Sequence, residues 1–428
     1  MYYKNIKIKE ADMKKKYIKI MAPVLAMTLA AGMFTGCGAD KKADDKREIT
    51  LMIPDWGAPD QELLDGFKEE TGITVNVNEV SWDDIRDKVA IASSGGSAVA
   101  DVIEVDWSWV GEFYAADWLE PIEMTDEEIA DMPTVSTFTK DGNIMALPYA
   151  NDYRMSYYNT ELFKKAGLEE PETWDDVYEA AKTIKKNGIA EYPFSIPLNA
   201  EESAATSLMW LAYTRNGIVF NDDNTLNKES VLDALNYEYS LITDELVAPA
   251  DKSSSGMDAY RRILSGDAAF TTGPTSFVAR SNDEEQCSVI GQISPILVPG
   301  KTAKSELTMP LPEAVGVTKF SENKEDAMTF VKWYTSPEIQ KELFDRNSTI
   351  PTHNNVLEEL IETGKIQNAG AMLEEAKRIG TPFPNGIPSY YAQMSHSIYN
   401  AVNKMALGTA TPEEAFEEMD KAVKELLE

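Results

Sequence analysis

Of the side chains that could carry out chemistry, histidine and cysteine are rare and carboxylates are abundant in this chain of 428 residues. It contains two histidines, His353 and His396, and two cysteines, Cys37 and Cys287, so a zinc site built from a cluster of these ligands is excluded. We therefore expect neither a metal site nor a cofactor. Carboxylates are abundant instead, with 72 Asp and Glu residues, and hydrolysis by a pair of carboxylates stays open at this point.

Acidic and aromatic residues stand together directly after stretches with the periodicity of strands. Trp56 follows residues 49–53, and Asp106 and Trp107 follow residues 102–105. In open α/β sheets, ligands lie beyond the carboxyl ends of the strands, so these side chains are candidates for a binding site. Two alternatives remain, since Trp56 could pack on the surface of its domain and Asp106 could cap the next helix.

The elements that would position these side chains alternate along the chain. Strand patterns at 49–53, 73–77 and 102–105 are separated by helical patterns, which predicts a mostly parallel sheet covered by helices. Hydroxyl residues placed to cap helices support this organisation. They are Ser81, Thr125, Thr173 and Thr411, the last opening an amphipathic helix over 413–427.

Charge and composition exclude two classes of partner. The chain carries 40 Lys and Arg against 72 Asp and Glu, a net charge of −32. Nucleic acids and anionic bilayers would repel such a surface, so we expect no nucleic-acid partner. With 43% hydrophobic residues, the chain has enough apolar material for two or three domains.

The N-terminal 36 residues differ from the rest. They hold seven lysines and two acids, followed by the apolar run Ile20–Phe34, which is the pattern of a secretory signal. Small residues lead into Cys37 and resemble a bacterial lipobox, with translation starting at Met1 or Met13. We expect a signal peptide over 1–36, lipidation of Cys37, a tether over 37–46 and a protein anchored to the outer face of the cell membrane. Cys287 would then have no disulfide partner.

Several motifs further along the chain are specific in combination. They are D-G-N-I-M-A-L-P-Y at 141–149, Y-Y-N-T-E-L-F-K-K-A-G-L at 157–168, T-W-D-D at 173–176, S-G-D-A-A-F-T-T-G-P at 265–274 and I-P-T at 350–352. Together they resemble the family 1 extracellular solute-binding proteins of ABC importers, the group that includes maltose-binding protein. The resemblance implies two α/β lobes around a ligand cleft, one at 47–150 and 297–350 and the other at 151–296 and 351–428.

The resemblance also suggests which residues hold the ligand. Asp152 matches a carboxylate position of maltose-binding relatives, although an ion pair with Arg154 is an alternative. For Trp210, a place in a helix core is favoured over stacking on a ligand. Thr275 stands where maltodextrin-binding relatives have a stacking Trp, which argues against a maltodextrin. The expected ligand-binding set is Trp56, Asp106, Trp107, Asp152, Arg154, Asn199, Trp210, Glu313, Tyr390 and Tyr391.

The function implied is capture of a carbohydrate by a monomeric lipoprotein and its delivery to an ABC permease, without enzymatic activity. A neutral sugar is favoured, because apart from Arg154 the candidate residues are acidic or aromatic. Three alternatives stay open. They are the same fold binding a glycerol phosphodiester, a sensor subunit, and an exported glycosidase using Asp106 and Asp152.

Overall fold

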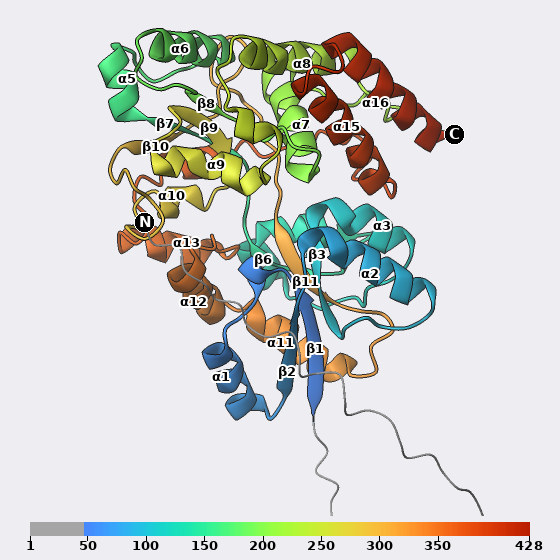
Figure 1. Cartoon of the computed structure of the whole chain (residues 1–428). Coiled ribbons are helices and arrows are strands. Elements are labelled where there is room, and N and C mark those ends of the chain that lie inside the picture. The colour runs from blue at the N-terminus through green and yellow to red at the C-terminus, as the bar shows by residue number, and fades with distance from the viewer. Residues whose placement is uncertain (1–46) are drawn as a thin grey trace, which may run out of the picture. The chain divides into compact units, whose positions relative to one another are not determined.

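The computed structural model describes residues 47–428, so the expected signal peptide, tether and lipidation site at Cys37 lie outside the described residues. The described chain forms two α/β lobes, each with its own sheet and covering helices (Figure 1). The α/β class and the two-lobed architecture expected from the sequence are thus confirmed.

The first lobe contains a five-stranded sheet. Its strands, in spatial order, are β2 (Thr74–Glu79), β1 (Glu48–Ile53), β3 (Val102–Asp106), β11 (Glu313–Val317) and β6 (Leu147–Ala150). β1 is parallel to β2 and β3, whereas β11 is antiparallel to its neighbours β3 and β6. The sheet is therefore mostly parallel, as predicted, with β11 running against the other four strands.

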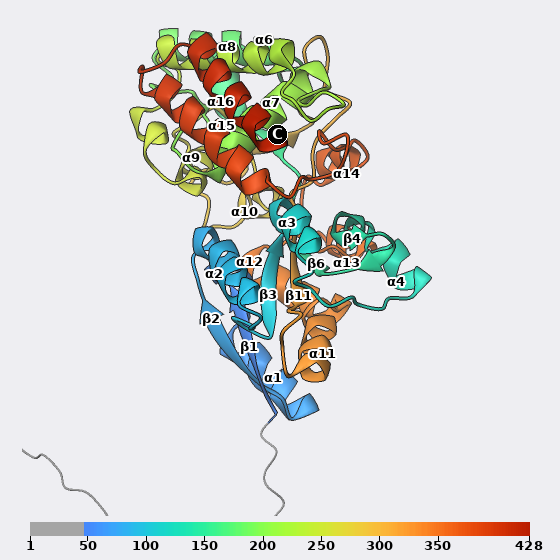
Figure 2. The same ribbon diagram turned by 90° about the vertical axis from the view of Figure 1, so that its right-hand side faces the viewer.

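Helices cover both faces of this sheet (Figure 2). They are α1 (Gln61–Thr71), α11 (Lys324–Tyr334) and α12 (Pro337–Asn347) on one face, and α2 (Trp82–Ser94) and α3 (Val110–Ala115) on the other. In β3, Val102 packs toward α1 and α11, and Ile103 packs toward α2. Because neighbouring residues of a strand point to opposite faces, Glu104 and Asp106 share the face of Val102.

The second lobe is built on a four-stranded sheet. Its strands, in spatial order, are β10 (Ile293–Ile296), β7 (Met155–Asn159), β9 (Phe270–Gly273) and β8 (Phe194–Ser195). The main helices are α5 (Thr160–Ala166), α6 (Trp174–Lys186), α7 (Glu202–Asn216), α8 (Lys228–Thr243), α9 (Gly256–Ser265), α10 (Phe277–Arg280), α15 (Tyr391–Ala406) and α16 (Pro412–Leu427). The amphipathic helix predicted at the end of the chain is α16.

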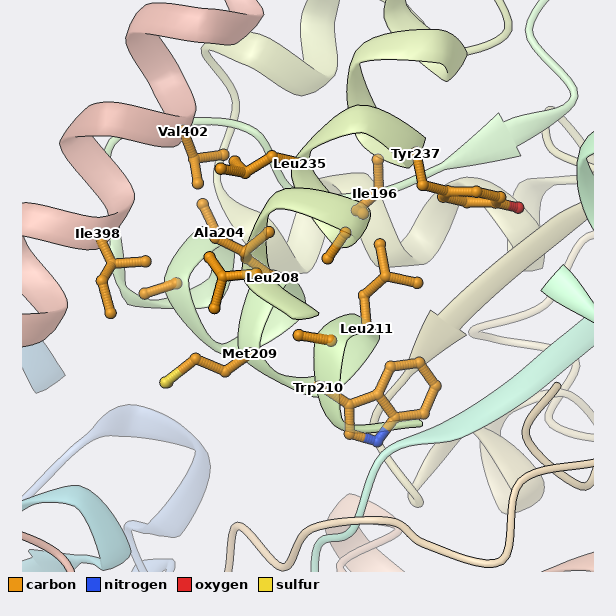
Figure 3. Close-up of a cluster of buried hydrophobic side chains, with 14 of the residues drawn as sticks. Ile196, Ala204, Leu208, Met209, Trp210, Leu211, Leu235, Tyr237, Ile398 and Val402 are labelled. Atoms are coloured by element: carbon orange, nitrogen blue, oxygen red, sulfur yellow. The ribbon is translucent and has the colours of Figure 1, made fainter. Parts of the chain in front are cut away.

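The core of the second lobe surrounds α7. This helix is buried on every side from Ala204 to Thr214, between α8 and α15. Figure 3 shows Leu208 of α7 with Leu235 of α8 and Val402 of α15 in this apolar cluster. A helix buried all round has no solvent-facing stripe, which marks it as the centre of its lobe.

Shorter elements complete the chain. They are α4 (Asp126–Asp131), β4 (Thr139–Lys140), β5 (Asn143–Ile144), α13 (Asn354–Glu362), α14 (Gly370–Ala376) and the 3₁₀ turns η1 (Asp55–Gly57), η2 (Trp107–Trp109), η3 (Pro133–Phe138) and η4 (Pro249–Lys252). η1 and η2 directly follow β1 and β3, and they carry two of the candidate tryptophans.

Three of the four predicted helix caps are present. Thr125, Thr173 and Thr411 each close a capping box with the acidic residue three positions later. The prediction for Ser81 is wrong, because this residue precedes α2 but its hydroxyl makes no capping hydrogen bond. Sequence alone could not separate these cases, since each has a hydroxyl followed by acids at suitable spacing.

The segments that connect the lobes lie side by side. The amide of Asn151 donates to the carbonyl of Ile350 at 2.9 Å, and the amide of Leu311 donates to the carbonyl of Asp152 at 2.7 Å. Leu311 still packs in the core of the second lobe, and the chain joins the first sheet at Glu313. The lobe boundaries drawn from the sequence stay a prediction.

Candidate functional site

A cavity of about 790 Å³ is lined by residues of both lobes. Six members of the expected ligand-binding set border it: Trp56, Asp106, Trp107, Asp152, Arg154 and Glu313. Those from the first lobe follow β1 and β3 or begin β11, at the edge of the sheet where the parallel strands end. The position after the strands thus places these side chains around one space.

The indole ring of Trp56 is fixed by hydrogen bonds at its edge. Its indole is 43% exposed, and its Nε1–H donates to both carboxylate oxygens of Glu313, at 3.1 and 2.9 Å. The hydroxyl of Tyr149 donates to Glu313 as well, at 3.0 Å. Glu313 therefore fixes the indole, while the ring face remains available to a flat apolar surface.

Three carboxyl groups lie together on the sheet edge below Trp56. Glu313 pairs with Asp106 across β11 and β3, and Glu104 shares the face of Asp106. Burial, strengthened by the Asp106 charge, raises the pKa of Glu313 to about 8. Burial also raises the pKa of Asp106 to about 6, although hydrogen bonds from Ser108 oppose the shift. Glu104 is fully buried, and burial together with its two acidic neighbours raises its pKa strongly. At neutral pH this edge of the sheet therefore carries less negative charge than three ionised carboxylates would give.

Asp152 and Arg154 form an ion pair, the alternative weighed for them from the sequence. The backbone amide of Thr275 also donates to Asp152, at 2.9 Å. The guanidinium of Arg154 lies over the ring of Tyr260, 5.2 Å from its centroid. Burial lowers the pKa of Arg154, but Asp152 and Tyr260 outweigh it and the pKa is raised. Both residues line the cavity, where Asp152 is already engaged by Arg154 and Thr275.

Thr275 cannot act as a stacking group, because it is completely buried and its hydroxyl donates to the carbonyl of Tyr153 at 2.6 Å. Trp107 also differs from a free aromatic platform. Only 4% of it is exposed, and its ring packs against Tyr391 and Phe383 of the second lobe, with centroids 5.2 and 6.3 Å away. Trp107 therefore borders the cavity while its ring is packed against aromatic residues of the second lobe.

Four expected residues lie outside the cavity lining. Trp210 is 2% exposed in the core of the second lobe (Figure 3). Its Nε1–H donates to Thr308 at 2.9 Å. Tyr391 is 2% exposed and donates to Glu202. Tyr390 is half-buried beside it, and the amide of Asn199 points to Glu201 at 3.4 Å. None of the four borders this cavity, and Trp210 and Tyr391 are packed in the core of the second lobe.

The cavity also brings together residues that the sequence analysis missed. The most notable are Tyr260, Arg261 and Arg280, which come from α9 and α10 of the second lobe. They stand on helices rather than after strands, so the rule that found Trp56 and Asp106 does not reach them. In the described part of the chain, no three His, Cys, Asp or Glu side chains are grouped so that they could hold a metal ion.

A match to a known protein family shows to which family the chain belongs. The model for bacterial extracellular solute-binding proteins matches residues 53–341. The chain belongs to this family. The resemblance seen in the sequence motifs is thereby confirmed.

Individual relatives of this solute-binding protein cover nearly its whole length. A binding protein of Brucella abortus strain 2308 is 24% identical over 403 residues, which is 90% of this chain and 94% of the relative. A solute-binding protein of Agrobacterium radiobacter K84, solved with ribitol, is 20% identical with a TM-score of 0.79 and covers 89% of this chain and 98% of its own. Another from Thermotoga lettingae TMO, solved with α-D-tagatose, is 24% identical with a TM-score of 0.74 and covers 90% and 100%. Among residues 47–428 of this solute-binding protein, no helix has the length and apolar character to cross a bilayer.

Proposed function

We propose that this solute-binding protein captures a carbohydrate in its cleft and delivers it to an ABC permease. The observation that carries the proposal is the half-exposed indole of Trp56, held at its edge by Glu313 and facing a cavity rich in carboxylates and arginines. A sugar offers an apolar C–H face for such a ring and hydroxyl groups for the charged side chains around it. Ribitol and tagatose, bound by two proteins of the same fold, are consistent with this class of solute.

Closure of the lobes would complete the contacts with the solute. The first lobe contributes Trp56 and Glu313, and the second contributes Tyr260 and the arginines, so neither lobe alone can surround a ligand. A solute that touches both walls binds the closed arrangement better than the open one and shifts the population toward it. The permease would then recognise the closed form. No bond is made or broken in this proposal.

The proposed set of ligand contacts is smaller than the set expected from the sequence. It comprises Trp56, Asp106, Asp152, Arg154 and Glu313, with Tyr260, Arg261 and Arg280 added from the cavity lining. Asp106 and Asp152 are assigned to hydrogen bonding rather than to hydrolysis, since Asp152 is already paired with Arg154.

A thermal-unfolding screen of the purified protein against mono-, di- and oligosaccharides and sugar alcohols tests the proposal. A ligand present at 100 times its Kd adds about 2.7 kcal/mol to the stability of the folded state and raises the Tm by a few degrees. The matched variants are Trp56→Ala, which should weaken binding by about 10-fold or more, and Trp333→Ala, a tryptophan outside the cavity lining. Release of a hydrolysis product, or binding unchanged in Trp56→Ala, would contradict the proposal.

We further propose that the protein is exported and anchored through a lipid on Cys37, as a monomer with the two lobes bounded as the motifs imply. The cationic head, the apolar run and the small residues before Cys37 support the anchor. Metabolic labelling with palmitate should mark the wild type and a Cys287→Ala control but not Cys37→Ala. Cys287 is a suitable control because it is buried, 3% exposed. Equal labelling of Cys37→Ala would exclude this anchor.

A further inference from the structure

Two arginines in the cavity wall differ from all the others. Of the nine arginines in the chain, seven form an ion pair with a carboxylate: Arg47, Arg86, Arg154, Arg215, Arg262, Arg346 and Arg378. Within residues 47–428, Arg261 and Arg280 make no ion pair, and both line the cavity. Because acidic residues outnumber basic ones so strongly in this chain, two unpaired arginines in one wall are unlike its general surface.

Arg280 is the more constrained of the two. It ends α10 and is half-buried, and its Nε is buried without a hydrogen-bond partner in the described structure. One Nη donates a long hydrogen bond, 3.4 Å, to the carbonyl of Asn347. Burial lowers the pKa of Arg280, and the charge of Arg261 lowers it further. The two guanidinium groups therefore repel each other, yet both remain charged at neutral pH.

Acidic residues of the same lobe are already engaged elsewhere. Asp152 is paired with Arg154, and Glu201 accepts hydrogen bonds from the backbone amide of Gly256 and from Ser203 at 2.7 Å. Glu202 accepts one from Tyr391 at 2.6 Å. Within residues 47–428, none of these carboxylates forms an ion pair with Arg261 or Arg280, so both guanidinium groups keep donors for a ligand.

The first-lobe wall carries the opposite charge but in weakened form. Its acidic lining residues are Asp55, Glu79, Asp106 and Glu313. Because the pKa of Glu313 is raised to about 8 by burial and by Asp106, this carboxyl is mostly neutral at pH 7. An anion held on the second-lobe wall would meet less repulsion from across the cavity than four full charges would give.

We propose that Arg261 and Arg280 form a subsite for an anionic group of the solute, a carboxylate or a phosphate, so that the substrates are acidic carbohydrates. This inference rests on the proposed function. A guanidinium group has a planar fork of donors that matches both anions, and it forms charge-assisted hydrogen bonds with them. The sequence favoured a neutral sugar because Arg154 was the only cation recognised among the candidates, and Arg261 and Arg280 change that balance.

Calorimetric titration with matched pairs of sugars tests the subsite. The probes are glucuronate with glucose, galacturonate with galactose and, for the phosphate form, glucose 1-phosphate and glycerol 3-phosphate. We expect an acidic probe to bind at least 10-fold more tightly than its neutral counterpart. Arg261→Gln and Arg280→Gln should each lose about 10- to 100-fold in affinity for it, whereas the surface control Arg346→Gln should not.

Three outcomes decide the inference. If a neutral sugar binds as tightly as its acidic counterpart, the subsite is refuted while the carbohydrate proposal stands. If the double variant Arg261→Gln/Arg280→Gln keeps full affinity for the acidic probe, the assignment of these residues is wrong. If none of the sugars binds, thermal melts with inorganic phosphate decide: a rise in Tm that the double variant lacks supports the subsite, and equal behaviour of both proteins refutes it.

Discussion

Glu238 gives a prediction about stability that depends on pH. This residue lies in α8, completely buried, and both of its carboxyl oxygens lack a hydrogen-bond partner within residues 47–428. Burial raises its pKa from 4.5 to about 8. The folded state therefore holds a proton that the unfolded chain releases above pH 4.5. Stability from this group is fully present below pH 4.5 and is lost as the pH rises toward 8.

The magnitude follows from the two pKa values. Between pH 5 and pH 7 the folded form stays protonated while the unfolded form ionises, which costs about 2.5 kcal/mol of unfolding free energy. Glu238→Gln removes the titration but keeps the size of the side chain. The free energy of unfolding of this variant, relative to that of the wild type, should therefore rise by about 2.5 kcal/mol between pH 5 and pH 7. The cost of burying the amide is the same at both pH values and does not affect this difference.

Urea unfolding at pH 5, 6, 7 and 8 measures this difference. Glu417→Gln, a substitution of an exposed glutamate in α16, serves as the control and should show no such trend. A stability difference between Glu238→Gln and the wild type that stays constant within 0.5 kcal/mol (an error on the order of the extrapolation) across these pH values would refute the reasoning. It would mean that Glu238 ionises in the folded protein with its ordinary pKa.

Two further predictions concern helix capping and the core. Thr173→Ala should cost about 1 kcal/mol because it removes a complete capping box from α6, whereas Ser81→Ala should change stability by less than ~0.5 kcal/mol, since Ser81 makes no capping bond; equal losses in urea melts would contradict this. Trp210→Phe should destabilise the protein by about 1–3 kcal/mol through lost packing and the lost bond to Thr308, while solute affinity, measured by calorimetry, stays within twofold. A large fall in affinity would return Trp210 to the site.

Much of the first lobe could be predicted from local sequence patterns. The strands at 49–53 and 102–105 were recognisable because they are buried, and alternation or continuous apolarity follows from burial. The position of β11 between β3 and β6 was not predictable in this way. Its partners precede it by a long stretch of chain, and no local pattern at Glu313 indicates where a strand will insert.

The residues of the candidate site likewise fall into those that a local sequence pattern reveals and those that it does not. Trp56 and Asp106 were found because the end of a strand is visible in sequence and fixes where a side chain points. Arg261 was missed because it is adjacent to Arg262, and both look like ordinary charged residues of a helix. Only in three dimensions does Arg262 meet the buried Asp251 while Arg261 reaches the cavity. Trp210 is the opposite case, a candidate for the site that lies in the core of the second lobe. A helix buried on all sides gives no periodicity that separates core residues from cleft residues.

The insertion of β11 also determines when the first sheet can form during synthesis of the chain. β3 ends at Asp106 and β6 ends at Ala150, but the strand that lies between them begins only at Glu313. A nascent chain that has emerged as far as the second lobe therefore has a first sheet with the position between β3 and β6 vacant and unpaired backbone on both sides of the gap. Such a sheet cannot close until most of the chain has been synthesised. Late completion keeps the polypeptide unfolded for longer, which suits the proposed export of this chain, since a chain is threaded through a translocation channel before it folds.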